Sequence, residues 1–233
     1  MLTIIIFLFM FIICFSNATT KIISIRSGGL KGFYMFGICK YIKDNYNLDN
    51  FYYFGASAGA WNSLFLSEIN NNEKLYNYLI DLKINNFKNM YEIELLLKNF
   101  ILNNYNDDDF DLYKLNLCVA VINGCRINKK IFSNLYTLDN ALECCLASSH
   151  IPYITSFNPT YTYKNFNCID GGIFKDPHNK LIKPNLLIYP DIWDNQKIND
   201  YANIHNLDIK NLIFQGYKDA YLNSEELKNK LIL

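Results

Sequence analysis

The stretch FYYFGASAGAW (residues 51–61) joins a run of aromatic residues to a run of small residues centred on Ser57. Aromatic residues favour strands, and residues 60–69 continue with mixed apolar character, so we expect a strand, a sharp turn and a helix. Gly55 and Gly59 lie two residues before and two residues after Ser57. Because glycine has no Cβ, this spacing lets the strand and the helix approach closely around a serine in a strained turn. The same spacing suits a plain strand-to-helix hinge, so the turn alone does not decide the function.

The same order of strand, turn and helix occurs earlier in the chain. The segment KIISI (21–25) is followed by Ser27-Gly28-Gly29 and then by a helical pattern over residues 30–46. Short apolar segments that alternate with longer helical patterns are typical of βαβ units with a mainly parallel sheet. No internal repeat and no domain linker interrupts the chain, and its 233 residues fit one domain. We therefore expect a single α/β domain over residues 19–233.

Further elements follow from the same patterns. The segment LNLCVAVING (115–124) predicts a buried strand, and its final Asn-Gly dipeptide predicts a hairpin turn into residues 125–133. Apolar residues recur at helical spacing between Asn72 and Asn104. Either Thr137 or Asp139 is suited to cap the next helix. The other expected elements are strands at 166–172, 185–190 and 211–215 and helices at 140–149 and 219–231.

Composition excludes several classes of function. The 22 Lys and Arg residues balance the 22 Asp and Glu residues, and no long basic run occurs, so we expect no nucleic-acid partner. No pair of cysteines or histidines has the spacing of a zinc site. The acidic run NDDDFD (106–111) lacks the glycine and the final glutamate of a calcium-binding EF-hand. We therefore expect neither a metal nor a cofactor.

The N-terminal segment has the features of a secretory signal. An apolar run from Ile4 to Phe15 is followed by Ser16-Asn17-Ala18, a small-x-small pattern that suits cleavage after residue 18. The run is shorter than the roughly 18 to 20 apolar residues that span a bilayer. We expect a signal peptide at residues 1–18 and a protein of the secretory pathway, with an uncleaved anchor or a buried N-terminal strand as alternatives.

Seven cysteines are present, and the expected signal peptide contains one of them, Cys14. The other six cysteines are an even number, which permits disulfides in an exported chain. Four of these cysteines lie in apolar segments, where a buried thiol behaves as a small hydrophobic side chain, so we expect mostly free and buried cysteines. These four are Cys118, Cys144, Cys145 and Cys168.

Residues 55–59 (GASAG) fit the pattern G-x-S-x-G, which holds a nucleophilic serine between a strand and a helix. The helix after Ser57 would point its N-terminus toward the serine, so the Ala58 N–H would stabilise an oxyanion. Two glycine-containing segments accompany this turn, RSGGLKG (26–32) before it and DGG (170–172) after it.

In this order, the three segments resemble the motifs of patatin-like phospholipases. RSGGLKG is similar to the glycine-rich oxyanion loop G-G-G-x-[R/K]-G of that family, and DGG is similar to its catalytic Asp-Gly-Gly. GASAGA resembles the animal-type branch that contains adiponutrin and adipose triglyceride lipase, as do LECCLASSHIPYIT (142–155) and GYKDAYLN (216–223). The resemblance runs from about Lys21 to about Leu222. It implies a three-layer α/β/α fold with a mainly parallel central sheet.

The resemblance also implies a lipid acyl hydrolase of the phospholipase or lipase type. Ser57 would attack an acyl ester, Asp170 would accept its proton, and the N–H groups of Gly28, Gly29 and Ala58 would form the oxyanion hole. A lipid or membrane-surface substrate would be the partner. The residues that support these motifs are Lys31, Gly32, Gly55, Gly59, Gly171 and Gly172.

An ordinary aspartate with a pKa near 3.9 is a weak base, so Asp170 would need desolvation or a direct hydrogen bond to Ser57. Lys31 would fix the oxyanion loop, although a solvated lysine at a helix start is an equal alternative. The chain departs from the family pattern at three positions. Ser27 replaces the first loop glycine, Asp176 stands where asparagine is common, and His150 stands where a small residue is usual.

Other functions share some of these residues. A Ser-Asp-His triad of the α/β-hydrolase type would use Ser57, Asp170 and either His178 or His205. A non-catalytic lipid-binding protein would keep the same fold, and an acyltransferase would use the same serine.

Overall fold

The computed structural model describes residues 20–70, 73–82, 87, 89–193 and 207–232. The signal peptide predicted at residues 1–18 lies outside these residues. Among the helices that the model describes, none is both long enough and apolar enough to cross a membrane.

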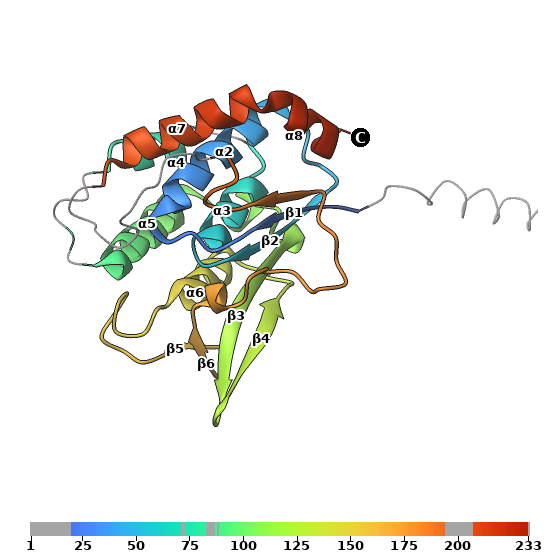
Figure 1. The fold of residues 1–233 in the computed structure, drawn as a ribbon. Helices are drawn as coiled ribbons and strands as arrows, with labels where there is room; N and C mark the ends of the chain where they lie inside the picture. Colours follow the sequence, from blue (N-terminus) through green and yellow to red (C-terminus); the bar gives the residue numbers. More distant parts are fainter. Residues whose placement is uncertain (1–19, 71–72, 83–86, 88, 194–206, 233) are drawn as a thin grey trace, which may run out of the picture.

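A mixed sheet of seven strands forms the centre of the described fold (Figure 1). The strand order is β5-β6-β3-β2-β1-β7, and β4 forms a hairpin with β3. β7, β1, β2 and β3 are parallel to one another, whereas β4, β5 and β6 pair antiparallel. The strands are β1 (Lys21–Ile25), β2 (Phe51–Ala56), β3 (Leu115–Asn123), β4 (Arg126–Phe132), β5 (Tyr161–Tyr163), β6 (Phe166–Ile169) and β7 (Leu186–Ile188).

Helices flank this sheet, as expected for a three-layer α/β/α fold. α3 packs against β1, β2 and β3, and α6 packs against β3, β5 and β6. Figure 1 shows α7 lying along α2 at the top, with the β3–β4 hairpin at the opposite end. The helices are α2 (Gly32–Asn45), α3 (Ala58–Ser67), α4 (Lys74–Ile80), α5 (Met90–Asn104), α6 (Leu138–Ser149), α7 (Ile209–Leu222) and α8 (Ser224–Leu231).

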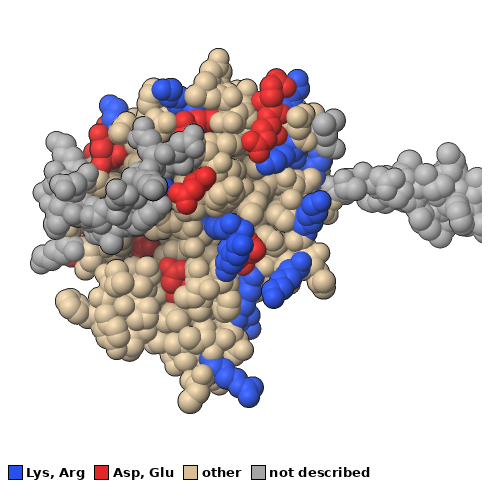
Figure 2. All heavy atoms as spheres, in the orientation of Figure 1, with Lys and Arg blue, Asp and Glu red and all other residues tan. Residues whose placement is uncertain are grey.

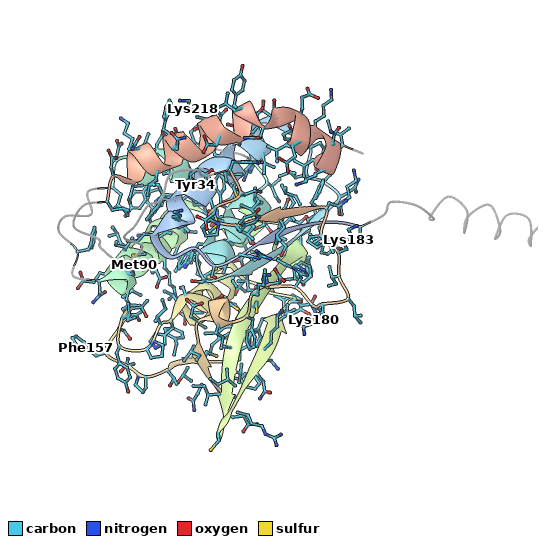
Figure 3. All side chains as sticks on the ribbon, in the orientation of Figure 1. Tyr34, Met90, Phe157, Lys180, Lys183 and Lys218 are labelled. Carbon is cyan, nitrogen blue, oxygen red and sulfur yellow. The ribbon has the colours of Figure 1, made fainter. Side chains whose placement is uncertain are left out.

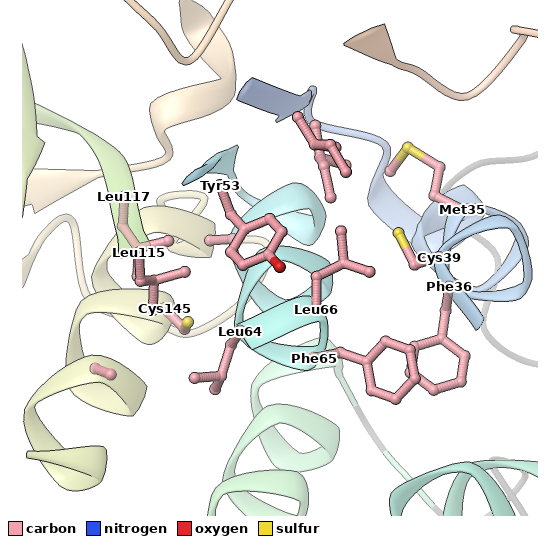
Figure 4. Packing of buried hydrophobic residues seen from close by; sticks show 14 of the residues in the cluster. Met35, Phe36, Cys39, Tyr53, Leu64, Phe65, Leu66, Leu115, Leu117 and Cys145 are labelled. Carbon is pink, nitrogen blue, oxygen red and sulfur yellow. The ribbon is translucent and has the colours of Figure 1, made fainter. Parts of the chain in front are cut away.

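The strand before Ser57 (β2) and the helix after it (α3) both pack into the main hydrophobic core (Figure 4). Phe65 of α3 packs on Phe36 of α2 with 4.3 Å between the ring centroids. Tyr53 of β2, Leu117 of β3 and Cys145 of α6 belong to the same buried cluster. Burial of these side chains fixes α3 against the sheet, and α3 begins directly after Ser57.

The cysteines of the described residues are free thiols, in agreement with the prediction of mostly free cysteines. Burial raises the pKa of the Cys118 thiol to about 12 and that of the Cys168 thiol to about 11, so both stay protonated at neutral pH. Five thiols are buried and Cys125 is exposed; the buried ones are Cys39, Cys118, Cys144, Cys145 and Cys168.

Two glycines allow α2 and α7 to lie in direct backbone contact. A Cβ on Gly37 of α2 would collide with the carbonyl oxygen of Ile213, and a Cβ on Gly216 of α7 would collide with that of Tyr34. Tyr34 also donates a hydrogen bond of 2.9 Å from its hydroxyl to Asp219 of α7. The contact therefore depends on glycine at both crossing positions.

We expect Gly37→Ala to lower the free energy of unfolding by about 1–3 kcal/mol, because the added methyl group forces the two helices apart. The better helix propensity of alanine offsets at most about 1 kcal/mol of this loss. Urea unfolding followed by circular dichroism measures the change. Lys218→Ala, on the exposed face of α7, is the control and should stay within about 0.5 kcal/mol of the wild type. Equal stability of Gly37→Ala and the wild type would contradict the close contact.

Most predicted elements are confirmed. The Asn123-Gly124 turn joins β3 to β4 with a φ of +57° at Gly124, and the Thr137 side chain caps α6 by accepting from the Asn140 N–H. The predicted strand at 211–215 is wrong, because these residues belong to α7. A short apolar run fits a strand or a buried helix equally well, and here the Asp208 side chain caps the helix by accepting from the Asn211 N–H. The short strand β5 was not predicted.

Candidate active site

Ser57 occupies the sharp turn between β2 and α3. Its φ of +56° and ψ of −128° lie outside the regions that non-glycine residues normally adopt. A Cβ on Gly55 would collide with the Gly59 carbonyl oxygen, and a Cβ on Gly59 would collide with the Ile25 carbonyl oxygen. Strand and helix therefore approach each other as closely as the sequence spacing predicts, and the strained residue between them is the serine.

The topology of the sheet brings Asp170 to this turn. β2 pairs parallel with Leu115–Cys118 of β3, and β6 pairs antiparallel with Ala120–Ile122. Since β4 occupies the other edge of β3 over Leu117–Asn123, β2 and β6 share the remaining edge. The two strands approach each other from opposite ends of that edge. The residues that follow them, Ser57 and Asp170, therefore meet beside the middle of β3.

A direct hydrogen bond joins these two side chains. The Ser57 hydroxyl donates to Asp170 Oδ2 at 2.7 Å, and both residues are buried. The other carboxylate oxygen, Oδ1, accepts the N–H of Gly172. The backbone N–H of Asp170 donates to the His150 carbonyl oxygen at 2.7 Å. Gly171 follows with its Cα against the Cys118 backbone of β3, so the Asp-Gly-Gly segment holds the carboxylate close to the serine.

Burial determines the basicity of this carboxylate. Desolvation raises the pKa of Asp170 to about 6, and hydrogen bonds from Ser57 and the Gly172 N–H limit the rise. At neutral pH the group is therefore mostly ionised, yet it binds a proton more strongly than an ordinary aspartate. Asp170 is thus both desolvated and hydrogen-bonded directly to Ser57, the two features that would make an aspartate a better base.

The glycine loop lies on the other side of Ser57. Gly29 has a φ of +50° and starts the single-turn helix η1 (Gly29–Lys31), which leads directly into α2. The N–H groups of Gly28, Gly29 and Ala58 have no hydrogen-bond acceptor among the residues that the structure describes. Ser27 is not among the described non-glycine residues with a positive φ, so a serine fits the backbone at this position without strain. Gly28, Gly29 and Ser57 line one cleft together with Asp170.

This cleft has a volume of about 510 Å³ and is bounded by the segments that follow β1, β2, β6 and β7. Its remaining lining residues are Ser27, Ile151, Pro152, Ile169, Gly172, Ile173, Pro190 and Asp191.

Lys31 lies at the end of the glycine loop as a buried, ion-paired residue and is not a solvated lysine. Its side chain is only 2% exposed, and its ammonium group donates to Asp191 at 2.6 Å. Asp191 follows β7 and lines the cleft, so the ion pair ties the loop to the opposite wall. Gly32 lies against Ala58, where an added Cβ would come within 2.7 Å of the alanine Cβ.

Ser148, a residue that the sequence did not single out, holds the Ser57 turn in place. The Ser57 N–H donates to the Ser148 hydroxyl at 2.9 Å, and that hydroxyl donates to the Cys118 carbonyl oxygen at 2.7 Å. α6 and β3 thereby fix the backbone of the strained serine. Ser148 belongs to the small-residue block at residues 142–155. The resemblance to the family concerned this block as a whole and assigned no role to Ser148.

A second cavity, of about 110 Å³, lies on the helical side of Ser57. Its walls come mainly from α2, α3, α4 and α5 and are almost entirely apolar. The apolar side chains that line it include Phe33, Phe36, Trp61, Leu64, Phe65, Leu75, Leu79, Ile93, Leu97 and Ile101.

Glu94 of α5 contributes a buried carboxyl group to this cavity. Burial raises the pKa of Glu94 to about 8. The group is therefore mostly protonated and neutral at pH 7, which suits the apolar walls. The sequence motifs do not include Glu94, although an acidic side chain beside the helical stripe of Ile93 and Leu97 is a recognisable signal.

The imidazole rings of the described histidines do not bond to Ser57 or to Asp170. His150 Nε2 lies 3.0 Å from the Asn158 carbonyl oxygen, and His178 Nδ1 lies 2.7 Å from the Ser24 hydroxyl. His205 lies outside the described residues. Asp176, the other departure from the family pattern, forms an ion pair with Arg26 at 2.7 Å. No group of His, Cys, Asp and Glu residues in the described ranges is arranged to hold a metal ion.

Comparison with known families agrees with this geometry. Residues 23–179 match the family model of patatin-like phospholipases, which is more than half of the chain. A comparison with curated proteins gave no match. The matched segment includes the glycine loop, the Ser57 turn and the Asp170 segment. The chain belongs to the patatin-like phospholipase family.

Proposed function

We propose that this protein hydrolyses acyl ester bonds of lipids through a dyad of Ser57 and Asp170. The family supports lipid acyl hydrolysis in general. The observation that carries the specific proposal is the 2.7 Å hydrogen bond from the Ser57 hydroxyl to a buried carboxylate. A serine nucleophile needs a base within hydrogen-bond distance, and Asp170 meets this condition without a histidine.

The reaction would proceed in two steps through an acyl-enzyme. Ser57 Oγ attacks the carbonyl carbon of the ester while its proton moves to Asp170 Oδ2. The N–H groups of Gly28, Gly29 and Ala58 stabilise the negative oxygen of the tetrahedral intermediate, aided by the N-terminus of α3. Asp170 returns the proton to the leaving alcohol oxygen as the ester bond breaks. A water molecule then attacks the acyl-serine, gives its proton to Asp170, and releases the fatty acid as that proton returns to Ser57.

The two cavities that meet at Ser57 divide the substrate between them. The apolar cavity of α2, α3, α4 and α5 would take the acyl chain, since burial of methylene groups is favourable there. The cleft beside Asp170 would take the alcohol part, because it opens next to the side chain that protonates the leaving group. The serine lines both cavities, so the ester carbonyl would lie at their junction.

We further propose membership of the animal-type branch. The block at residues 216–223 lies in α7, beyond the segment that matches the family model. Within it, Gly216 and Asp219 both contact Tyr34 of α2, the helix that follows the glycine loop. These contacts give the block a role in supporting the loop, which favours a domain that extends through α7.

Acyl release provides the test of the proposed function. We expect the protein to release fatty acid from phosphatidylcholine or triacylglycerol and p-nitrophenol from short-chain p-nitrophenyl esters. Product analysis with an added acceptor alcohol separates hydrolysis from acyl transfer. Free fatty acid as the main product supports the hydrolase, whereas an ester of the acceptor supports the acyltransferase. Lipid binding without any acyl release would favour the non-catalytic alternative.

The pH dependence of hydrolysis should follow two buried carboxyl groups. We expect kcat/KM to rise with pH through about 6 and then level off, because Asp170 must be ionised to accept the serine proton. With long acyl chains, activity should fall again above about pH 8, because ionised Glu94 places a charge in the acyl cavity. The rates of hydrolysis of long-chain and short-chain esters, measured across this pH range, test both effects. Glu94→Gln is the control: it should lose the alkaline fall and keep the acid limb.

A further inference from the structure

Four large apolar side chains project into solvent at the mouth of the cleft. Tyr153, Ile154 and Phe157 of the loop after α6 are 71%, 64% and 92% exposed, and Ile173 after Asp170 is 54% exposed. Figure 3 shows Phe157 at the lower left, directed away from the body of the protein. We call these four residues the apolar rim. Exposed apolar side chains gathered in one place mark a contact surface.

The apolar rim is continuous with the cleft. Ile151 and Pro152, which precede Tyr153 in the chain, line the cleft beside Ser57 and Asp170. Ile173 belongs both to the rim and to the cleft wall. A ligand that covers the rim would therefore lie next to the mouth of the site.

The loop that carries most of the rim belongs to an uncharged part of the chain. Between Cys144 and Tyr163 the sequence contains no Lys, Arg, Asp or Glu. His150 is buried, and desolvation lowers its pKa below its ordinary value, so its ring is neutral as well. Figure 2 shows this lower-left part of the surface in tan, without blue or red side chains. Such a surface can leave water without the cost of desolvating a charge.

Internal hydrogen bonds give the loop a defined shape. The Thr155 hydroxyl accepts the Ile151 N–H at 3.0 Å, and the Thr155 N–H donates to the Ile151 carbonyl oxygen at 3.0 Å. The His150 ring bonds to the Asn158 carbonyl oxygen, and Tyr153 has a φ of +62°. The polar groups are thus satisfied inside the loop while the apolar side chains face outward. This arrangement gives His150, one of the three departures from the family pattern, a role in holding the loop.

From these observations we propose that the apolar rim inserts into the surface of a lipid aggregate and delivers substrate to the cleft, an inference that rests on the proposed lipid acyl hydrolysis. The occupant is a lipid surface because the rim lies beside the mouth of a site with an apolar acyl cavity and itself carries no charge. Binding should not require anionic lipid and should depend only weakly on salt, since no Lys or Arg belongs to the rim.

The experiment compares two double variants. Ile154→Ser with Phe157→Ser removes the outer part of the rim, and neither residue lines either cavity. Phe214→Ser with Leu222→Ser is the matched control on α7, where these side chains are 64% and 66% exposed. Binding is measured by co-sedimentation with vesicles of diether phosphatidylcholine, which have no acyl ester to cleave. Activity is measured on ester phosphatidylcholine vesicles and on a soluble short-chain p-nitrophenyl ester below its aggregation limit.

The rim variant should bind vesicles at least about tenfold more weakly than the wild type, since each large apolar side chain contributes about one tenfold step. Its vesicle hydrolysis should fall in parallel, while kcat/KM for the soluble ester stays unchanged. The control variant should match the wild type in all three measurements.

Three results would overturn the proposal. They are vesicle binding by the rim variant equal to that of the wild type, binding that appears only with anionic lipid, and a concentration-dependent dimer that the rim variant abolishes. The failure of the proposed function looks different. In that case the wild type would bind vesicles through the rim without hydrolysing even the soluble ester.

Discussion

Ser57→Ala should lose ester hydrolysis by at least about 10⁴-fold in kcat, because the variant has no nucleophile to form the acyl-enzyme. The fold should be unaffected, since alanine keeps the Cβ and the backbone N–H that donates to Ser148. The measurement is p-nitrophenol release from a short-chain ester, with circular dichroism to verify folding.

Ser63→Ala is a matched control for this variant. Ser63 is also a buried serine, six residues further along the chain in α3, and its hydroxyl has no hydrogen-bond partner among the described residues. We expect this variant to keep nearly full activity. Activity in Ser57→Ala within tenfold of the wild type would exclude Ser57 as the nucleophile.

Asp170→Asn should lower kcat by at least about 10³-fold, in the upper part of the range for general base catalysis. The amide accepts no proton at any accessible pH, so the acid limb near pH 6 should disappear together with the activity. Asp176→Asn is the control, because Asp176 pairs with Arg26 instead of the serine. If Asp170→Asn kept wild-type activity, the base would have to be another group.

The same substitution should make the protein more stable at neutral pH. The folded-state pKa of Asp170 is about 6, above the ordinary value of 3.8, so stability that this group contributes at low pH is lost as pH rises through about 6. Asparagine removes this buried charge and should raise the free energy of unfolding by about 2–3 kcal/mol at pH 7. The gain should vanish below about pH 4. Urea unfolding at both pH values therefore separates loss of a base from loss of the fold.

The two residues proposed to react could be predicted from the sequence, whereas the residues that hold them in place could not. Ser57 was predicted from a short motif with strong steric requirements and Asp170 from the resemblance of its Asp-Gly-Gly segment to the family, and the structure brings the two into hydrogen-bond contact. Ser148 and Glu94 were not predicted, because their roles depend on segments that meet only in the fold. Ser148 is 91 residues from Ser57, and Glu94 shares with Ser57 only the lining of the apolar cavity. A serine in a small-residue block and a glutamate on an amphipathic helix acquire meaning only when the elements are packed.

Among the helices and turns, features that depend on neighbouring residues were predicted, and features that depend on distant contacts were not. The Gly124 turn and the Thr137 cap follow from local backbone geometry, and both are confirmed. Residues 211–215 form a helix because α7 packs along α2 through Gly37 and Gly216, a contact between segments far apart in the sequence. The environment of Lys31 is likewise set by a distant residue, Asp191, which follows β7.

Labelling with a fluorophosphonate, followed by peptide mass spectrometry, tests the Ser57–Asp170 dyad most directly. The reagent forms a covalent bond with an activated serine, so no lipid substrate has to be identified first. We predict a single adduct on Ser57 in the wild type, formed at a rate that rises with pH through about 6, and no adduct at this position in Asp170→Asn over the same time. An adduct on another serine, or equal labelling of Ser57 in the wild type and in Asp170→Asn, would contradict the proposed dyad.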